Sequence, residues 1–334
     1  MSMPFTLFPA ARAALALSLP LWLVLAGCGG GGAAAGTGSG DGAIDGSSDF
    51  ATAARTLYTA LPDTSICRAG TLTAAERSGV LATVNTIRAA HGLAAVSLDT
   101  AGENEVMQAA LMSVVNGQLS HTPPTTWGCY SAAGRTGAET GNLYLGGPSA
   151  FLTLAPSASI LTSWLADVGS EATLGHRRWM LDPFLKQIAF GRVDVQAASG
   201  VRTTGAVLKV IYGTDGVGPV TSDYVAYPVG DYKKAYFQGN PIQSFTAIAD
   251  KASRTANGLS KVDYGVATVS VVPRGGTALS VSEVSPDYVG YGVPNLLRFR
   301  AAGITAGVVH DVTVANVRVN GVLRSYSYSF RLVD

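Results

Sequence analysis

Residues 174–183 read Leu-Gly-His-Arg-Arg-Trp-Met-Leu-Asp-Pro and stand between a predicted helix and two predicted strands. The helix is expected over residues 157–168, because its apolar side chains recur at helical spacing. The strands are expected over residues 188–195 and 207–212, where short apolar runs replace that spacing. His176 is the notable residue of this stretch, because an imidazole binds protons and metals near neutral pH.

Two more helices are predicted upstream of this stretch. Residues 73–76 form a capping box, in which the Thr and Glu side chains satisfy amides of the first turn. The apolar face that follows ends at Gly92, a typical helix stop. Another helix is expected to begin at residue 99 or 100 and to end at Gly117. Helices on both sides of a small sheet predict a three-layer α-β-α domain.

The pattern changes from residue 221 onward to short apolar runs separated by Gly, Pro and Asn. The predicted strands cover residues 224–229, 245–248, 268–272, 279–284, 296–300, 311–319 and 322–333. Asn320-Gly321 favours a type I′ hairpin between the last two strands. We therefore predict an all-β sandwich, immunoglobulin-like or fibronectin-III-like, that serves as a spacer or an adhesive domain.

The N-terminus has the layout of an export signal. Residues 1–27 carry one charge, Arg12, and an apolar stretch too short to span a membrane comfortably. Leu25-Ala26-Gly27-Cys28 resembles the lipobox of bacterial lipoproteins, which implies a lipid anchor on Cys28 and sorting to the outer membrane or cell surface of a Gram-negative cell. The alternative is an ordinary signal peptide with an incidental cysteine.

Four segments are predicted along the chain. They are a lipoprotein signal peptide over residues 1–27, a Gly/Ala/Ser-rich tether over 28–48, an α/β domain over 49–218 and a β-sandwich over 219–334. The chain has 334 residues, of which 47% are hydrophobic and 13% charged, with a formal net charge of +1. This balance argues against a nucleic-acid partner, and the apolar content argues against wholesale disorder.

Two cysteines, Cys67 and Cys129, remain after the lipobox. Export to an oxidising compartment predicts a disulfide between them. The alternative is a pair of free thiols.

Five segments of the chain resemble the CAP superfamily of SCP-like, pathogenesis-related-1-like extracellular domains. They are the opening helix at 85–93, the first histidine motif at 119–121, the G-E-N-L segment at 137–143, the tryptophan helix at 164–167 and the second histidine motif at 174–183. The third segment departs from the family, because Ala138 precedes its Glu and two residues separate Glu from Asn. The resemblance implies a CAP fold and an extracellular location.

In that family two histidines and two acidic residues face one another across a surface cleft. Residue by residue, the resemblance places His121, Glu139 and His176 on three of these positions. The fourth position, usually a Glu three residues after the tryptophan, is held here by Asp167. Glu171 is the alternative acid.

Imidazoles bind divalent transition metals, and carboxylates orient them. Two histidines with two acids form a looser set than a closed zinc site, so we expect at most a weakly held divalent metal, zinc first. The sequence has no G-x-S-x-G or H-E-x-x-H motif to supply hydrolytic chemistry. We therefore predict a binding cleft for a lipid, a glycan or a partner protein. The alternatives are a secreted hydrolase that uses the His/acidic cluster and an architectural envelope protein.

Structural roles for these residues remain open. In the alternative interpretation, His121 caps a helix C-terminus and His176 is a structural histidine held by a carboxylate. His91 is expected to be exposed and inert. Arg177 and Arg178 are expected either to form a basic rim or to be salt-bridged parts of the fold.

Overall fold

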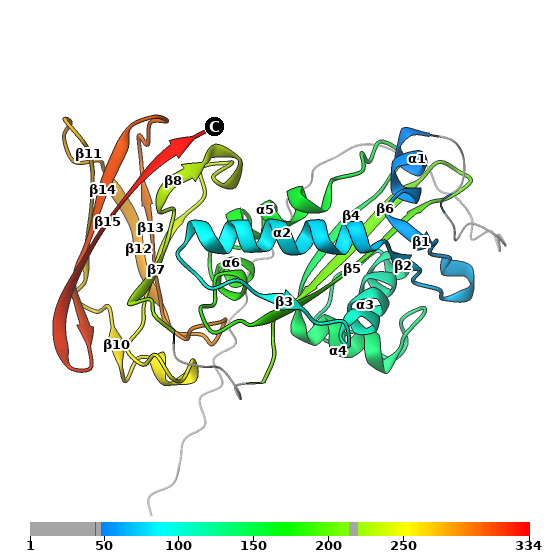
Figure 1. Cartoon of the computed structure of the whole chain (residues 1–334), viewed down its shortest axis with the longest axis horizontal. Helices are drawn as coiled ribbons and strands as arrows, with labels where there is room; N and C mark the ends of the chain where they lie inside the picture. The colour runs from blue at the N-terminus through cyan, green and yellow to red at the C-terminus, as the bar shows by residue number, and fades with distance from the viewer. Residues whose placement is uncertain (1–43, 45–47, 214–219) are drawn as a thin grey trace, which may run out of the picture. The chain divides into compact units, whose positions relative to one another are not determined.

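The protein is described by a computed structural model that covers residues 44, 48–213 and 220–334 (Figure 1). The predicted signal peptide, Cys28 and most of the predicted tether lie outside these residues. The described residues belong to one compact unit. Within the described ranges, every helix is too short or too polar to cross a bilayer.

A 4-stranded sheet forms the centre of the N-terminal part. Its order is β3 (Ser97–Leu98), β5 (Gln187–Gln196), β6 (Arg202–Lys209) and β4 (Gly141–Ser149). β5, β6 and β4 are antiparallel, and β3 lies parallel to β5. The predicted strand at 188–195 is confirmed as β5. The second strand begins earlier than predicted, because its polar Arg-Thr-Thr start masked the apolar run that follows.

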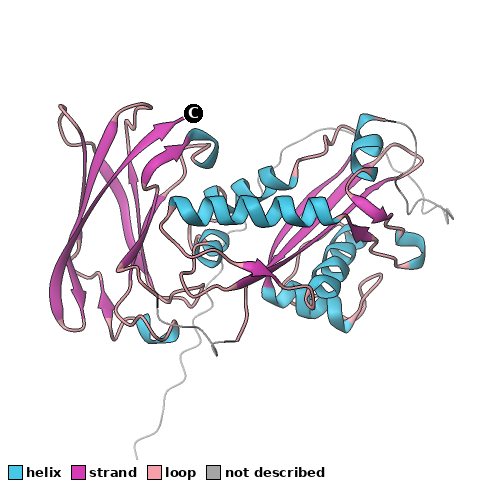
Figure 2. Ribbon diagram, viewed as in Figure 1, coloured by secondary structure: helices cyan, strands magenta, loops and turns pink. Residues whose placement is uncertain are grey.

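Helices pack around this sheet (Figure 2). They are α1 (Asp49–Arg55), α2 (Ala74–Ala90), α3 (Glu103–Asn116), α4 (Ala132–Thr140), α5 (Ser157–Ala166) and α6 (Gly175–Met180). The predicted capping box is confirmed in part, since the Thr73 side chain accepts a hydrogen bond from the Glu76 amide at 3.1 Å. Gly117 ends α3 in the left-handed region, with φ 59°, as predicted.

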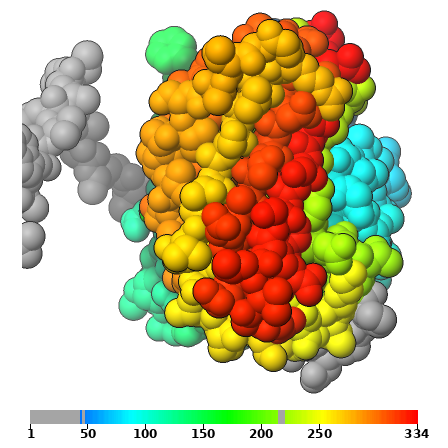
Figure 3. Space-filling model, turned by 90° about the vertical axis from the view of Figure 1, so that its left-hand side faces the viewer, coloured from blue at the N-terminus to red at the C-terminus, as the bar shows by residue number. Residues whose placement is uncertain are grey.

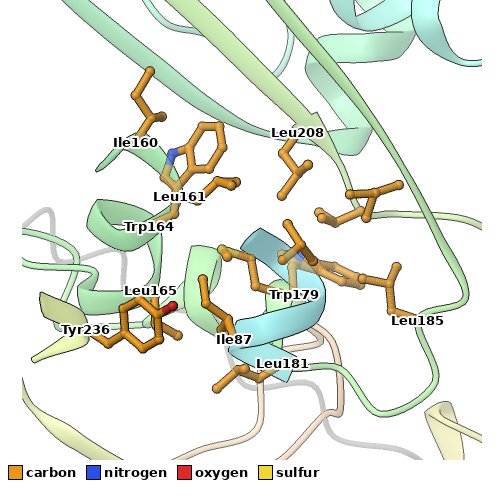
Figure 4. Close-up of a cluster of buried hydrophobic side chains, with 14 of the residues drawn as sticks. Ile87, Ile160, Leu161, Trp164, Leu165, Trp179, Leu181, Leu185, Leu208 and Tyr236 are labelled. Atoms are coloured by element: carbon orange, nitrogen blue, oxygen red, sulfur yellow. The ribbon is translucent and has the colours of Figure 1, made fainter. Parts of the chain in front are cut away.

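The two faces of the sheet are covered differently. The backbone of α3 lies against Gly205 of β6, where a Cβ atom would stand 2.8 Å from the Ala110 carbonyl oxygen. Leu208 lies on the opposite face of the same strand, since odd and even positions of a strand alternate. There it joins Ile87 of α2 and Trp179 of α6 in the apolar cluster of Figure 4.

The predicted disulfide is confirmed. Cys67 and Cys129 are bonded, with a Cα–Cα distance of 5.2 Å. Cys67 follows a 3-10 helix, η1 (Thr64–Ile66), between the short strands β1 (Tyr58–Ala60) and β2 (Thr71–Leu72). The bond ties this N-terminal hairpin to the segment that precedes α4.

The C-terminal region is entirely β apart from two 3-10 helices, η2 (Lys234–Tyr236) and η3 (Thr255–Asn257). One sheet has the order β10 (Val262–Asp263), β14 (Val309–Val319), β15 (Val322–Val333) and β8 (Gly230–Lys233), with β11 (Thr268–Pro273) also paired to β14. The other has the order β12 (Val281–Asp287), β13 (Leu296–Ala301), β9 (Gln243–Ala247) and β7 (Tyr224–Tyr227). The prediction of a mixed α/β region followed by an all-β region is confirmed.

The two sheets of this region pack against each other through aromatic side chains. The rings of Phe245 on β9 and Tyr328 on β15 are stacked with their centroids 6.4 Å apart. The outer surface of β14 and β15 (orange to red) is seen in Figure 3. Asn320 and Gly321 have φ of 49° and 80° and connect the paired residues Val319 and Val322, which confirms the predicted hairpin.

Polar contacts join the α/β part to the β region. His91 is buried, and its Nδ1 donates to the Ala226 carbonyl of β7 at 2.8 Å. The prediction that His91 is exposed and inert is therefore wrong. Arg177 and Arg178 are also buried, and Arg178 pairs with Asp287 of β12 at 2.8 Å. The salt-bridged interpretation is confirmed for Arg178, whereas Arg177 is a buried part of the fold that donates to backbone carbonyls. A basic rim is excluded for both.

Candidate functional site

His176 and Asp167 form a hydrogen-bonded pair. His176 lies in the first turn of α6, and Asp167 ends α5 in the left-handed conformation, with φ 54°. The Nδ1 atom of His176 donates to Oδ1 of Asp167 at 2.7 Å. Asp167 is buried, whereas the His176 side chain is 28% exposed. A buried carboxylate thus orients a partly exposed imidazole.

The acceptor fixes the tautomer of His176. A carboxylate oxygen accepts hydrogen bonds, so Nδ1 carries the proton and the neutral ring has its lone pair on Nε2. The other oxygen of Asp167, Oδ2, accepts a hydrogen bond from the Arg177 amide at 3.3 Å. Both carboxylate oxygens are therefore occupied by α6.

His121 follows α3 in the chain but contacts α4. Its Nδ1 atom donates to the carbonyl oxygen of Ala138 at 2.7 Å. That carbonyl belongs to the last turn of α4, which leaves its C=O groups without intrahelical partners. His121 therefore caps the C-terminus of α4, and not that of α3, the helix that it follows in the chain. It also has its proton on Nδ1 and its lone pair on Nε2.

Glu139 lies next to Ala138, on the exposed surface of α4. Its Oε1 atom accepts a hydrogen bond from Nε of Arg135, one helical turn earlier, at 2.7 Å. Exposed pairs at this spacing contribute only a few tenths of a kcal/mol. The pair therefore does not commit the Glu139 carboxylate permanently to Arg135.

Asn142 connects the segment after α4 to α6. Its side-chain amide donates to the backbone carbonyl of His176 at 3.1 Å. The segment from Ala138 to Asn142 thus contacts His121 at one end and His176 at the other. No role was predicted for Asn142, although its place in the G-E-N-L segment is the signal that marks it.

Glu171 is placed differently from Asp167. Because α5 ends at Ala166, Glu171 lies in the following loop and does not extend the face of Trp164. Hydrogen bonds from the Gly169 amide and from its own amide lower the pKa of the Glu171 carboxyl. Of the two candidate acids, Asp167 is the one bonded to His176.

The donor set around these residues is small. In the described part of the chain, no group of three or more His, Cys, Asp and Glu side chains is arranged to hold a metal ion. Both Nδ1 atoms are used in hydrogen bonds, Asp167 orients His176, and Glu139 pairs with Arg135. The Nε2 lone pairs of His121 and His176 remain for coordinating a ligand.

Comparison with known proteins identifies the region that contains these residues. No curated protein was found to match the chain. Residues 81–207 match the profile of CAP, the Cysteine-rich secretory protein family. The matched range includes His121, Glu139, Asp167 and His176. This chain therefore contains a domain of the CAP superfamily, whose members are typically extracellular.

Proposed function

We propose that this chain is a cell-envelope binding protein whose CAP domain uses His121 and His176 to hold a ligand and, weakly, a divalent metal. The observation that supports this most is the common tautomer of the two histidines. Each Nδ1 atom donates to an oxygen at 2.7 Å. Each neutral ring therefore keeps its Nε2 lone pair for a ligand.

The Asp167–His176 pair fits a metal ligand. Metal-binding histidines usually donate their second ring nitrogen to a carboxylate or a carbonyl, which fixes the ring and raises its basicity. Two imidazoles are fewer ligands than the three or four of ordinary zinc sites, so occupancy would be weak and exchangeable. A bound zinc ion would supply a positive centre for an anionic or carbonyl group of the ligand.

A hydrolase is the second candidate, because a carboxylate that orients a histidine is also the arrangement of a general base. This function requires a nucleophile or an activated water in addition. Both Cys67 and Cys129 are consumed by the disulfide. An envelope protein with a purely architectural role is the third candidate.

The remaining parts of the proposal concern location and architecture. The mature chain is anchored by a lipid on Cys28, and residues 49–218 form the α-β-α sandwich of the CAP fold. The β region is an immunoglobulin-like or fibronectin-III-like sandwich. The ligand class is a lipid, a glycan or a partner protein, and the balance of 23 basic against 22 acidic residues argues against nucleic acid.

Zinc titration of the purified full-length chain tests the proposal. Calorimetry should detect saturable Zn²⁺ binding that His121→Ala and His176→Ala each weaken at least about tenfold. Binding that is unaffected by both substitutions would refute a histidine-centred metal site. If candidate ester or glycan substrates are turned over and both variants abolish turnover, the hydrolase is correct instead. If neither variant has a cellular phenotype but Cys28→Ala does, the architectural role is favoured.

A further inference from the structure

Arg177 lies beside the Asp167–His176 pair and is 1% exposed. Its Nε atom donates to the Leu165 carbonyl at 2.7 Å, and its Nη2 atom donates to the Ala166 carbonyl at 2.6 Å. These carbonyls end α5, where an α-helix lacks internal donors. Arg177 therefore caps α5 immediately before Asp167.

The same guanidinium group reaches the C-terminal β region. Nη1 of Arg177 donates to the Ile242 carbonyl at 2.6 Å and to the Ser244 hydroxyl oxygen at 3.3 Å. The guanidinium carbon also lies 3.7 Å from the centroid of the Tyr227 ring. Tyr227 and Ser244 belong to β7 and β9. One side chain thus contacts both the end of α5 and the β region.

The backbone and the charge of Arg177 also act on Asp167. The Arg177 amide donates to Oδ2 of Asp167 at 3.3 Å. Burial lowers the pKa of the guanidinium, and the carboxylate charge of Asp167 opposes this effect. A buried cation needs such compensation, because removing an unpaired charge from water is unfavourable.

We infer that Arg177 is a positioning residue that couples the β region to the Asp167–His176 pair. The β region is then a structural part of the site. The sequence had instead predicted a spacer or an adhesive domain. The inference rests on the proposed function only in taking His176 as the functional imidazole. The planar fork of arginine is required, because the single ammonium of lysine cannot reach acceptors on two sides in fixed directions.

The direct readout is the tautomer of His176, measured on the full chain by ring ¹⁵N chemical shifts. The wild type should hold the proton on Nδ1. Arg177→Lys and Arg177→Met should populate both tautomers. The backbone amide of residue 177 remains, but the end of α5 that carries Asp167 loses its side-chain cap. Zn²⁺ affinity should fall about tenfold or more in the same variants, the usual effect of losing a partner that orients a ligand.

Arg178→Met is the matched control. Arg178 is also buried at the same interface, where it pairs with Asp287 and donates to the Val289 carbonyl. This variant should weaken the contact with the β region but leave the His176 tautomer unchanged.

Two results would overturn the inference. One is a folded Arg177→Lys protein, judged by near-UV circular dichroism, whose His176 tautomer is that of the wild type. The other is an equal tautomer change in Arg178→Met, which would indicate general loosening of the interface. If Arg177→Met does not fold, the His176 tautomer in Arg177→Lys alone tests the inference. The tautomer is measured without metal, so failure of Zn²⁺ binding would refute the proposed function and leave this inference standing.

Discussion

Nε2 of His91 lies 3.0 Å from the phenolic oxygen of Tyr232, a contact that joins the end of α2 to β8 across the chain. Nδ1 of His91 donates to the Ala226 carbonyl, so Nε2 accepts the proton of the Tyr232 hydroxyl. Burial disfavours a second proton on this ring. The imidazole is therefore held neutral between the two parts of the fold.

This arrangement predicts that stability falls in mild acid. Burial is the main reason that the pKa of His91 is lowered from 6.5 to about 4. Below pH 6.5 the unfolded chain binds a proton at His91 that the folded chain does not bind. The free energy of unfolding should therefore decrease as the pH falls from about 6.5 to about 4, by ~3 kcal/mol from this residue.

Urea unfolding of the wild type and of His91→Gln at pH 7.5 and pH 4.5 measures this contribution. The glutamine variant is expected to be less stable at pH 7.5, since its amide does not reproduce both contacts. Its additional loss at pH 4.5 should be smaller than that of the wild type. Equal losses in both proteins would show that His91 does not titrate on unfolding.

Asp167→Asn should weaken the site without removing a large side chain. An amide in place of the carboxylate removes the charge that orients His176, so Zn²⁺ affinity is expected to fall about 10- to 100-fold. Glu171→Gln serves as the comparison, because the Glu171 carboxyl is bonded to the backbone of its own loop. A larger effect of Glu171→Gln than of Asp167→Asn would reverse the assignment of the two acids.

Local signals in the sequence predicted local structure well. The start of α2, the end of α3 and the hairpin at residues 320–321 each depend on neighbouring residues, and each was predicted. α4 was missed, because Gly134 and Gly137 lower its helix propensity. These glycines instead let α4 approach α3 closely, since a Cβ at Gly134 would lie 3.0 Å from the Gln108 carbonyl oxygen.

Polar contacts between the α/β part and the β region were beyond the reach of the sequence. The partners of His91 lie 135 and 141 positions away, so nothing near residue 91 indicates burial. The contacts of Arg177 could not be predicted either, because its acceptors are backbone carbonyls, which every residue has. The Asp167–His176 contact was suggested only by resemblance to the CAP family, and the structure supplies the tautomer that the resemblance could not.

The disulfide should contribute substantially to stability. It closes a loop with a sequence separation of 62, which the chain-entropy account values at about 4 kcal/mol. Urea unfolding of the Cys67→Ser/Cys129→Ser protein should give a correspondingly lower free energy than the oxidised wild type. The wild type in reducing agent is the control and should approach the variant. Identical unfolding midpoints for oxidised and reduced protein would contradict the prediction.

Two glycine substitutions should act in opposite directions. Alanine at Gly205 would press on the Ala110 carbonyl of α3 from 2.8 Å, and overpacking of this kind usually destabilises by about 1–3 kcal/mol. Gly79 lies on the exposed surface of α2, where an added Cβ would meet nothing within 4 Å. Gly79→Ala should therefore stabilise the protein by up to about 1 kcal/mol, because alanine has the higher helix propensity. Thermal unfolding of both variants measures the signs. If Gly205→Ala leaves the unfolding temperature unchanged, α3 can shift away from β6 without cost. The close contact between α3 and the sheet would then not contribute to stability.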